Sequence, residues 1–256
     1  MFQVFTALLP ALLLSEGGAL VPTPKAAPAS ESARLKAMRR AARDGMCTND
    51  FEDAAIAAIG GEFAATYGEL TPRGFGTLAT HIGLAPEDRF LDCGSGLGRL
   101  VVQAAREYGC SSSAGIEYAA SRHDLAVVNL NRQLLDHSDL QSRVALLQGD
   151  CADTSLWRAQ ATLNKCTVAF AANLLFDEAL NARLKRCLEE EGTALRCVAS
   201  LKAWPNGLQG FSEPTEVRCE TSWSAPLVVV GSEEGSLVPH VGTVVYVYER
   251  DRCGKE

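Results

Sequence analysis

Hydrophobic and polar positions along the chain alternate in units typical of an α/β domain. Short apolar runs that end at Gly or an acidic residue predict buried strands, and longer segments with apolar positions three or four apart predict helices. The expected helices cover residues 50–59, 72–82, 97–108, 121–136, 155–163 and 177–191. The expected strands cover residues 90–92, 113–117, 144–150, 166–171 and 193–200, followed by late strands at 223–224, 227–230 and 243–248. This order predicts a mostly parallel sheet with helices on both faces, in which the last two strands form an antiparallel pair.

The N-terminal part of the chain differs in composition from the rest. The apolar run at 2–14 is too short to cross a bilayer and fits a signal-peptide core, although no Lys or Arg precedes it. Residues 22–33 are rich in Ala, Pro and Ser, which is typical of a transit peptide or a flexible linker. In tandem the two segments fit import into an organelle such as a complex plastid, and a disordered N-terminus without a sorting role is the alternative.

These shifts divide the chain into four parts. We assign residues 1–30 to a targeting or disordered segment and 31–62 to a helical segment that includes a short basic helix at 32–43. The folded domain is expected at 63–250, and 251–256 form a tail. A domain of this size is expected to be a monomer, with no membrane span in the mature protein.

Charge and cysteine content exclude several classes of function. The formal net charge of -7 argues against a protein that binds nucleic acid strongly through phosphate neutralisation. The 9 Cys are odd in number and contain no C-x-x-C pair, so we expect reduced, mostly buried thiols and neither a disulfide framework nor a metal site. The 4 His are scattered and predict no His-based catalytic set.

A glycine-rich turn follows the first expected strand. Asp92 ends the strand, and Gly94, Gly96 and Gly98 come at alternate positions before a helical pattern begins. Glycines let a ligand approach the backbone closely, and the N-terminus of the helix offers free N–H groups. The spacing differs from the dinucleotide fingerprint G-x-G-x-x-G and resembles motif I of the class I S-adenosylmethionine (SAM) methyltransferases.

Acidic residues stand at the ends of three expected strands, at Asp92, Glu117 and Asp150. Ligands of open α/β sheets bind outside the carboxyl ends of the strands, so we expect these three side chains to lie around one site. The two carboxylate oxygens of Glu117 suit adjacent ribose hydroxyls, and Asp150 can accept a hydrogen bond from an adenine amino group. Glu69, just upstream of the first strand, is a candidate acceptor for the SAM ammonium.

Several of these motifs together resemble one family in order and spacing. They are Tyr67-Gly68-Glu69 and the segments 90–98, 115–117, 149–150 and 173–176, and they resemble the non-SET histone lysine methyltransferases of the disruptor-of-telomeric-silencing family. The resemblance covers about residues 63–250. It implies a class I, Rossmann-like methyltransferase fold, SAM as methyl donor with S-adenosylhomocysteine as product, histone H3 as a protein substrate and a nuclear location. It also implies cofactor contacts from Tyr67, Glu69, Asp92, Gly94, Gly96, Gly98, Glu117, Asp150 and Cys151.

The same resemblance puts Asn173 and Phe176 at the channel for the acceptor lysine, as the catalytic positions. The expected reaction is an in-line transfer of the SAM methyl to a neutral lysine amine. Alignment and desolvation supply most of the catalysis in such a reaction, and no metal is needed.

The chain departs from the family pattern at several positions. Ala172 stands where the first of two consecutive Asn is usual, Arg99 replaces a Gln, and Cys151 replaces the aromatic residue that follows the acid of the third strand. No long basic tail is present for gripping nucleosomal DNA. Two alternatives therefore stay open. One is a small-molecule or organellar protein methyltransferase, since a weaker similarity points to the mitochondrial lysine methyltransferases that modify an ATP synthase subunit. The other is a SAM-binding module without transfer activity.

Overall fold

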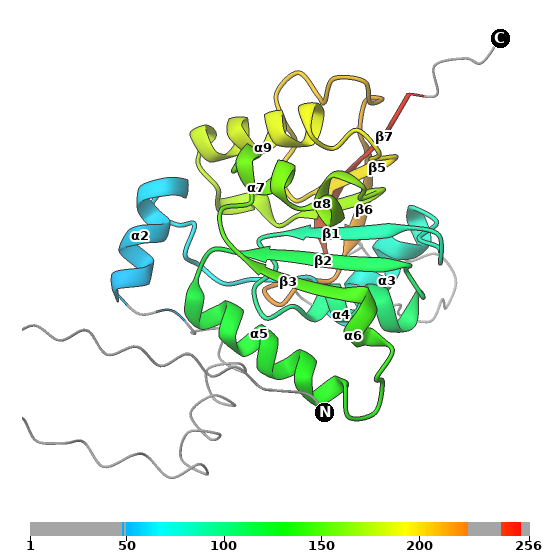
Figure 1. Cartoon of the computed structure of the whole chain (residues 1–256). Coiled ribbons are helices and arrows are strands. Elements are labelled where there is room, and N and C mark those ends of the chain that lie inside the picture. The colour runs from blue at the N-terminus through cyan, green and yellow to red at the C-terminus, as the bar shows by residue number, and fades with distance from the viewer. Residues whose placement is uncertain (1–47, 49, 225–241, 252–256) are drawn as a thin grey trace, which may run out of the picture.

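The computed structural model describes residues 48, 50–224 and 242–251, which form an α/β domain (Figure 1). The elements in chain order are α2 (Asp50–Gly60), α3 (Pro72–His81), β1 (Arg89–Cys93), α4 (Arg99–Glu107), β2 (Ser112–Glu117), α5 (Ala120–Gln133), α6 (Leu140–Arg143), β3 (Val144–Gln148), α7 (Thr154–Ala159), α8 (Ala161–Asn164), β4 (Val168–Ala171), the 3₁₀ helix η1 (Asn173–Leu175), α9 (Glu178–Glu190), β5 (Cys197–Ser200), β6 (Thr215–Cys219) and β7 (Thr243–Glu249).

The strands form one seven-stranded sheet in the order β3-β2-β1-β4-β5-β7-β6. The first five strands in this order are parallel, whereas β7 runs antiparallel to both β5 and β6. The chain moves outward from β1 through β2 to β3 and then returns to the other side of β1 with β4. This reversal makes the carboxyl ends of β1 and β4 the switch point at which ligands of such sheets bind. The expected mostly parallel Rossmann-like sheet is confirmed.

Helices cover both faces of the sheet, and each face has its own hydrophobic core. In Figure 1, α7, α8 and α9 lie on one face and α3, α4, α5 and α6 on the other. The first core is centred on Trp157, which is fully buried with Leu163 of α8 and Leu184 of α9. The second is formed by Phe75 and Leu100, from α3 and α4, against the opposite side of the same strands. Both faces of the sheet are therefore covered.

Two helix starts near the site have clear local causes. Thr71 caps α3, its hydroxyl accepting from the Gly74 N–H at 3.1 Å, and Pro72 fits the first turn because its missing N–H is not needed there. Gly74 also lies against the chain beyond β6, since a Cβ there would come within 1.9 Å of the Glu220 carbonyl oxygen. Asp177 caps α9, its carboxylate accepting from the Leu180 N–H at 2.7 Å.

The structure corrects several expected elements. The helix expected at 155–163 is two short helices, α7 and α8, that meet at Gln160. Residues 223–224 form no strand. Besides β5, β7 pairs with β6, a strand that the sequence pattern did not predict. β6 is an edge strand whose side chains are mostly exposed, so its sequence Thr-Glu-Val-Arg lacks the apolar alternation of a half-buried strand. The expected strand at 227–230, the signal-like and transit-like segments and the basic helix at 32–43 lie outside the described residues.

The part of the chain that the structure describes contains buried cysteine thiols but no cluster of metal-ligating side chains. Seven cysteines there are free and buried. Within the same residues, no group of three or more His, Cys, Asp or Glu side chains is placed to hold a metal ion. The described helices also include none that combines the length and apolar character needed to cross a membrane.

Candidate functional site

In the glycine turn between β1 and α4, all three glycines have positive φ angles, a conformation that favours glycine. The φ angles of Gly94, Gly96 and Gly98 are 90°, 53° and 70°. The N–H groups of Gly94 and Ser95 both donate to the Ile116 carbonyl at 2.9 Å, which ties the turn to the end of β2. The turn thus crosses the open edge of the sheet as a fixed loop, with α4 starting directly behind it.

Tyr67 lies over this turn. A Cβ added to Gly96 would come within 2.7 Å of the Tyr67 ring, so glycine is required here by both its φ and the close approach of the ring. The Tyr67 hydroxyl donates to Glu69 Oε2 at 2.7 Å, and burial together with that carboxylate raises the Tyr67 pKa. The guanidinium of Arg122 lies 5.3 Å from the ring centroid.

Glu117 joins the glycine turn to the start of α5. Its Oε2 accepts from the Gly96 N–H at 2.8 Å, and its Oε1 accepts from the Ala119 N–H at 2.8 Å. The residue is only 6% exposed, yet each carboxylate oxygen keeps a further lone pair. Glu117 can therefore hold the turn and accept hydrogen bonds from a pair of ligand hydroxyls at once.

Asp92 is a buried acid that lacks a full set of partners. It is 3% exposed, and its Oδ1 is buried without a hydrogen-bond partner. Burial raises the pKa of Asp92 to about 8, and the charges of Glu117 and Glu69 add to the effect. A buried acid in this state is costly unless a ligand supplies a donor or a positive charge.

Glu69 reaches the same region from the segment before α3. Its Oε1 forms an ion pair with Arg99, the first residue of α4, while Oε2 accepts from Tyr67. The Glu69 N–H donates to the Ser222 hydroxyl at 3.3 Å, which connects this segment to the chain after β6. The position that departs from the family pattern, Arg99, thus pairs directly with the expected ammonium acceptor.

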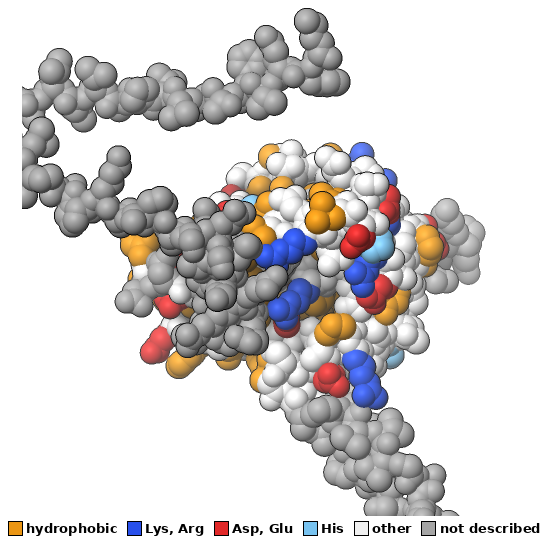
Figure 2. Space-filling model, turned by 90° about the horizontal axis from the view of Figure 1, so that it is seen from below, with side chains coloured by type: hydrophobic (Ala, Val, Ile, Leu, Met, Phe, Trp, Pro, Cys, Tyr) orange, Lys and Arg blue, Asp and Glu red, His pale blue; other side chains and the backbone are white. Residues whose placement is uncertain are grey.

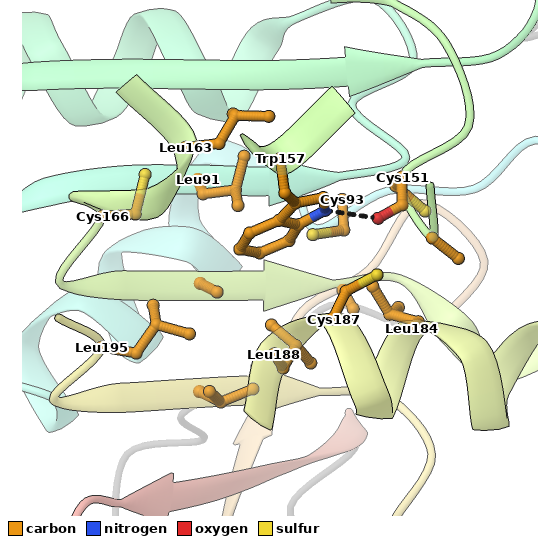
Figure 3. Packing of buried hydrophobic residues seen from close by; sticks show 14 of the residues in the cluster. Leu91, Cys93, Cys151, Trp157, Leu163, Cys166, Leu184, Cys187, Leu188 and Leu195 are labelled. Atoms are coloured by element: carbon orange, nitrogen blue, oxygen red, sulfur yellow. Dashed lines mark hydrogen bonds between the residues drawn. The ribbon is translucent and has the colours of Figure 1, made fainter. Parts of the chain in front are cut away.

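Asp150 and Cys151 form the opposite end of the site, beyond β3. Asp150 Oδ1 accepts from the Ala152 N–H at 2.8 Å, and Oδ2 accepts from Arg183 of α9 at 2.9 Å. Cys151 is 7% exposed, and its carbonyl accepts from the Trp157 indole N–H at 2.9 Å. Figure 3 shows this bond, with the indole packed among the side chains of the first core. The turn that carries Asp150 is thereby anchored to the hydrophobic core.

The side chains of Asn173 and Phe176, the expected acceptor-site residues, point to different parts of the structure. Asn173 is fully buried, its Oδ1 accepting from the Lys202 N–H at 2.9 Å and its Nδ2 donating to Asn181 Oδ1 at 2.7 Å. Its side chain therefore joins η1 to the chain after β5 and to α9. Phe176 faces the glycine turn instead, because a Cβ on Gly94 would lie 3.5 Å from its ring.

A single pocket brings most of these residues together. Predicted residues in its lining include Tyr67, the first two glycines, Glu117, Asp150, Cys151 and Phe176. Its wall also contains side chains that the sequence did not single out, namely Ile56, Ile59, Arg122 and Leu180. Ile56 and Ile59 come from α2, which lies beside the carboxyl ends of the strands (Figure 1). The pocket thus combines acids, apolar side chains and exposed backbone, which suits a polar ligand with an aromatic ring.

Trp223 is another residue with a position near the site that the sequence did not indicate. A Cβ on Gly68 would come within 2.4 Å of its ring, so the indole lies directly against the Tyr67-Gly68-Glu69 segment. It is 46% exposed. No local sequence signal connects residues so far apart.

A second hollow lies between α4 and α5, beyond the glycine turn. Its lining includes Arg99, Arg106 and Arg132 as well as Glu107. Figure 2 views the molecule from this side and shows Lys and Arg side chains near the middle of the face, with acidic side chains beside them. Arg106 is held there by the side chain of Gln133 at 2.8 Å.

Comparison with solved structures supports the fold. The chain resembles the methyltransferase domain of bacterial CtHen1 with a TM-score of 0.50 and 14% sequence identity, over 71% of this chain and 100% of that one. At this identity the likeness establishes the architecture alone.

Comparison with characterised sequences identifies relatives. The chain is 31% identical over 145 residues to the H3 lysine-79 specific histone-lysine N-methyltransferase of Eremothecium gossypii, which covers 55% of this chain and 25% of that protein. It is 30% identical over 122 residues to the protein of the same name from Caenorhabditis elegans, covering 46% of this chain and 13% of that protein. The chain therefore spans a quarter or less of the length of these two relatives. The family model described as "Histone methylation protein DOT1" matches residues 62–216. With more than half of its length in that match, and with the glycine turn and its surrounding acids inside it, the chain belongs to the DOT1 family of histone methylation proteins.

Proposed function

We propose that this protein is a SAM-dependent protein-lysine N-methyltransferase whose substrate is histone H3. Its relatives in Eremothecium gossypii and Caenorhabditis elegans are named as H3 lysine-79 specific histone-lysine N-methyltransferases. The observation in this chain that carries the proposal is the unpartnered, buried oxygen of Asp92 beside the glycine turn. Burial raises the pKa of Asp92, and the nearby charges of Glu117 and Glu69 add to the effect. A buried acid with an unpartnered oxygen and two further acids near it favours a ligand with positive charge and hydroxyl donors.

The chain's residues fit SAM in a specific orientation. Asp92 and Glu69 would receive the ammonium of the methionine part, and Glu117 would accept from the ribose hydroxyls. Asp150 would accept from the adenine amino group, and Cys151 would lie beside the ring. Tyr67 and the glycine turn would enclose the region between these two ends. This assignment explains why the site combines glycines, acids and an apolar wall.

The transfer step needs little acid–base chemistry from the protein. SAM supplies an electrophilic methyl group when it is bound. Phe176 and the turn at Gly94 would form a wall that excludes water and directs the lysine amine in line with that methyl. A buried channel lowers the pKa of an amine, which favours the neutral, nucleophilic form. Asn173 would act as a positioning residue, since its side chain fixes η1 beneath this wall.

A methyl-transfer assay tests the proposal. The full chain is incubated with SAM carrying a tritiated methyl group and with nucleosomes, free histones or an organelle extract in separate reactions. We expect label on histone H3, and we expect the Glu117→Ala variant to transfer none. Label on extract proteins but not on either histone preparation would overturn the histone substrate while keeping the methyltransferase.

A second candidate function is SAM binding without methyl transfer. The observation that favours it is the position of Asn173, which is fully buried, bonded to Lys202 and Asn181, and outside the pocket lining. Ala172, which does line the pocket, has no polar side-chain atom, so neither side chain offers the amine an acceptor. Tight binding of SAM without transfer to any of the three preparations would support this candidate over the first.

The proposed substrate implies a nuclear location for the protein. The signal-like segment at 2–14 lies outside the described residues, and its organellar alternative makes a different prediction. Imaging of the full chain carrying a C-terminal fluorescent tag separates the two, since nuclear signal supports the histone substrate and organellar signal contradicts it.

A further inference from the structure

Arg183 connects three elements at the adenine end of the site. From α9 its Nη1 donates to Asp150 Oδ2 at 2.9 Å, and its Nη2 donates to the Ile59 carbonyl of α2 at 3.3 Å. Its side chain is 36% exposed and that of Asp150 is 18% exposed. A guanidinium is a rigid, planar donor, so two bonds to different elements fix these elements relative to each other.

The contact with α2 brings a hydrogen-bond donor and a positive charge to the C-terminal end of this helix. Ile59 is in the last turn of α2, where carbonyl groups have no partner within the helix and carry partial negative charge. The last turn of α2 contains no basic residue of its own. Arg183 therefore provides a positive charge and a donor for the Ile59 carbonyl, beside the Asp177 N–H, which donates to the Gly60 carbonyl at 2.8 Å.

The contact with Asp150 orients the acid. Oδ1 is occupied by the Ala152 N–H and Oδ2 by Arg183, so the plane of the carboxylate is fixed from two sides. Each carboxylate oxygen has a second lone pair that can accept a donor from within the pocket. Asp150, Ile59 and Leu180 all line that pocket, and Leu180 stands one helical turn before Arg183 on α9.

We infer that Arg183 is a positioning residue that links recognition of the ligand's adenine amino group by Asp150 to the seating of α2 against the pocket. The inference rests on the proposed function, because it takes an adenosyl ligand in this orientation. Loss of Arg183 would leave the Ala152 N–H alone to orient the carboxylate of Asp150, and it would leave the Ile59 carbonyl without its donor. The consequence is a specific loss of adenine selectivity in addition to any general weakening of binding.

The test compares two ligands by calorimetry on the full chain. One is S-adenosylhomocysteine, and the other is its analogue with hydrogen in place of the adenine amino group. For the unmodified protein we expect the amino group to strengthen binding about 10-fold, as for a hydrogen bond to a charged acceptor. In Arg183→Met we expect S-adenosylhomocysteine to lose about 10-fold more affinity than the analogue loses, so that the preference for the amino group nearly disappears.

Two further variants make the result specific. Arg183→Lys keeps the charge but cannot bridge Asp150 and Ile59, so we expect an intermediate preference and a variant that stays folded. Arg186→Met removes an arginine from the same helix and should leave the preference unchanged. Equal weakening of both ligands in Arg183→Met, or an unchanged preference in both Arg183 variants, overturns the inference. Failure of the unmodified protein to bind S-adenosylhomocysteine overturns the proposed function itself. The titration of the unmodified protein therefore separates this outcome from a failure of the inference about Arg183.

Discussion

Replacement of Asp92 by Asn should make the ligand-free protein more stable at alkaline pH. The pKa of Asp92 is raised from 3.8 to about 8, because burial and the nearby charges of Glu117 and Glu69 disfavour the carboxylate. Between these two values the folded state holds a proton that the unfolded state has released, so stability falls as the pH rises. Above pH 8 the folded protein carries the full cost of a charged Asp92. The amide of the Asp92→Asn variant does not titrate, so this cost disappears.

The size of the effect follows from the two pKa values. Each pH unit between 3.8 and 8 costs about 1.4 kcal/mol, which gives about 3 kcal/mol at pH 6 and about 5–6 kcal/mol at pH 8.5. The Asn amide has a desolvation cost of its own, but that cost does not depend on pH. The difference in stability between Asp92→Asn and the unmodified protein should therefore shift by about 2–3 kcal/mol in favour of the variant between pH 6 and pH 8.5. For a domain of this size that corresponds to about 5–10 °C in Tm.

The assay is thermal unfolding of both proteins at pH 6 and pH 8.5 without ligand. Asp88→Asn is the matched control, because Asp88 is also buried, at 2% exposure, but has the opposite environment. Burial alone would raise the pKa of Asp88, yet hydrogen bonds from Arg196, Thr167 and the Ala85 N–H outweigh this and hold it below its usual value. The stability that the charged Asp88 carboxylate contributes is lost only when the pH falls toward its lowered pKa, well below pH 6. Asp88→Asn should therefore destabilise the protein by the same amount at both pH values. A constant Tm difference between Asp92→Asn and the unmodified protein would refute the reasoning about Asp92.

Other consequences of the site can be measured in the same preparations. Binding of S-adenosylhomocysteine should tighten between pH 5.5 and 7, by up to about tenfold per pH unit, since its ammonium favours charged Asp92; calorimetry should find this dependence absent in Asp92→Asn. Gly96→Ala should destabilise the protein by about 1–3 kcal/mol and abolish binding, because its Cβ would overlap Tyr67 at a positive φ; an unchanged urea midpoint would contradict the close contact. Trp157→Phe should destabilise by about 1–3 kcal/mol, because the carbonyl of Cys151 loses its donor. Normal stability of that variant in urea would show that the bond is not needed to anchor the turn.

The glycine turn and its acids were predictable because both depend on short-range patterns. A buried strand that ends in an acid is recognisable from a few residues, and parallel strands bring such ends to one edge of the sheet. Glu117 and Asp150 therefore line the same pocket, as expected. Asp92 was predicted beside the turn on the same grounds, but its missing partner is visible only once its surroundings are known.

Features that depend on contacts between distant segments were not predictable. Arg183 meets Ile59 across 124 residues, and no periodicity in either helix indicates this contact. The edge strand β6 was missed because its polar, exposed residues lack a hydrophobic pattern. Asn173 stands at the expected end of β4, but hydrogen bonds to Lys202 and Asn181 turn its side chain into the protein.

The central claim is that the acids around the glycine turn hold SAM for methyl transfer to histone H3. Its most direct measurement is mass spectrometry of H3 from nucleosomes after incubation with the full chain and SAM, beside the same reaction with Asp92→Asn. We predict methylated lysine in H3 with the unmodified protein and none above background with the variant. Equal methylation by both proteins, or none by the unmodified protein, would contradict it.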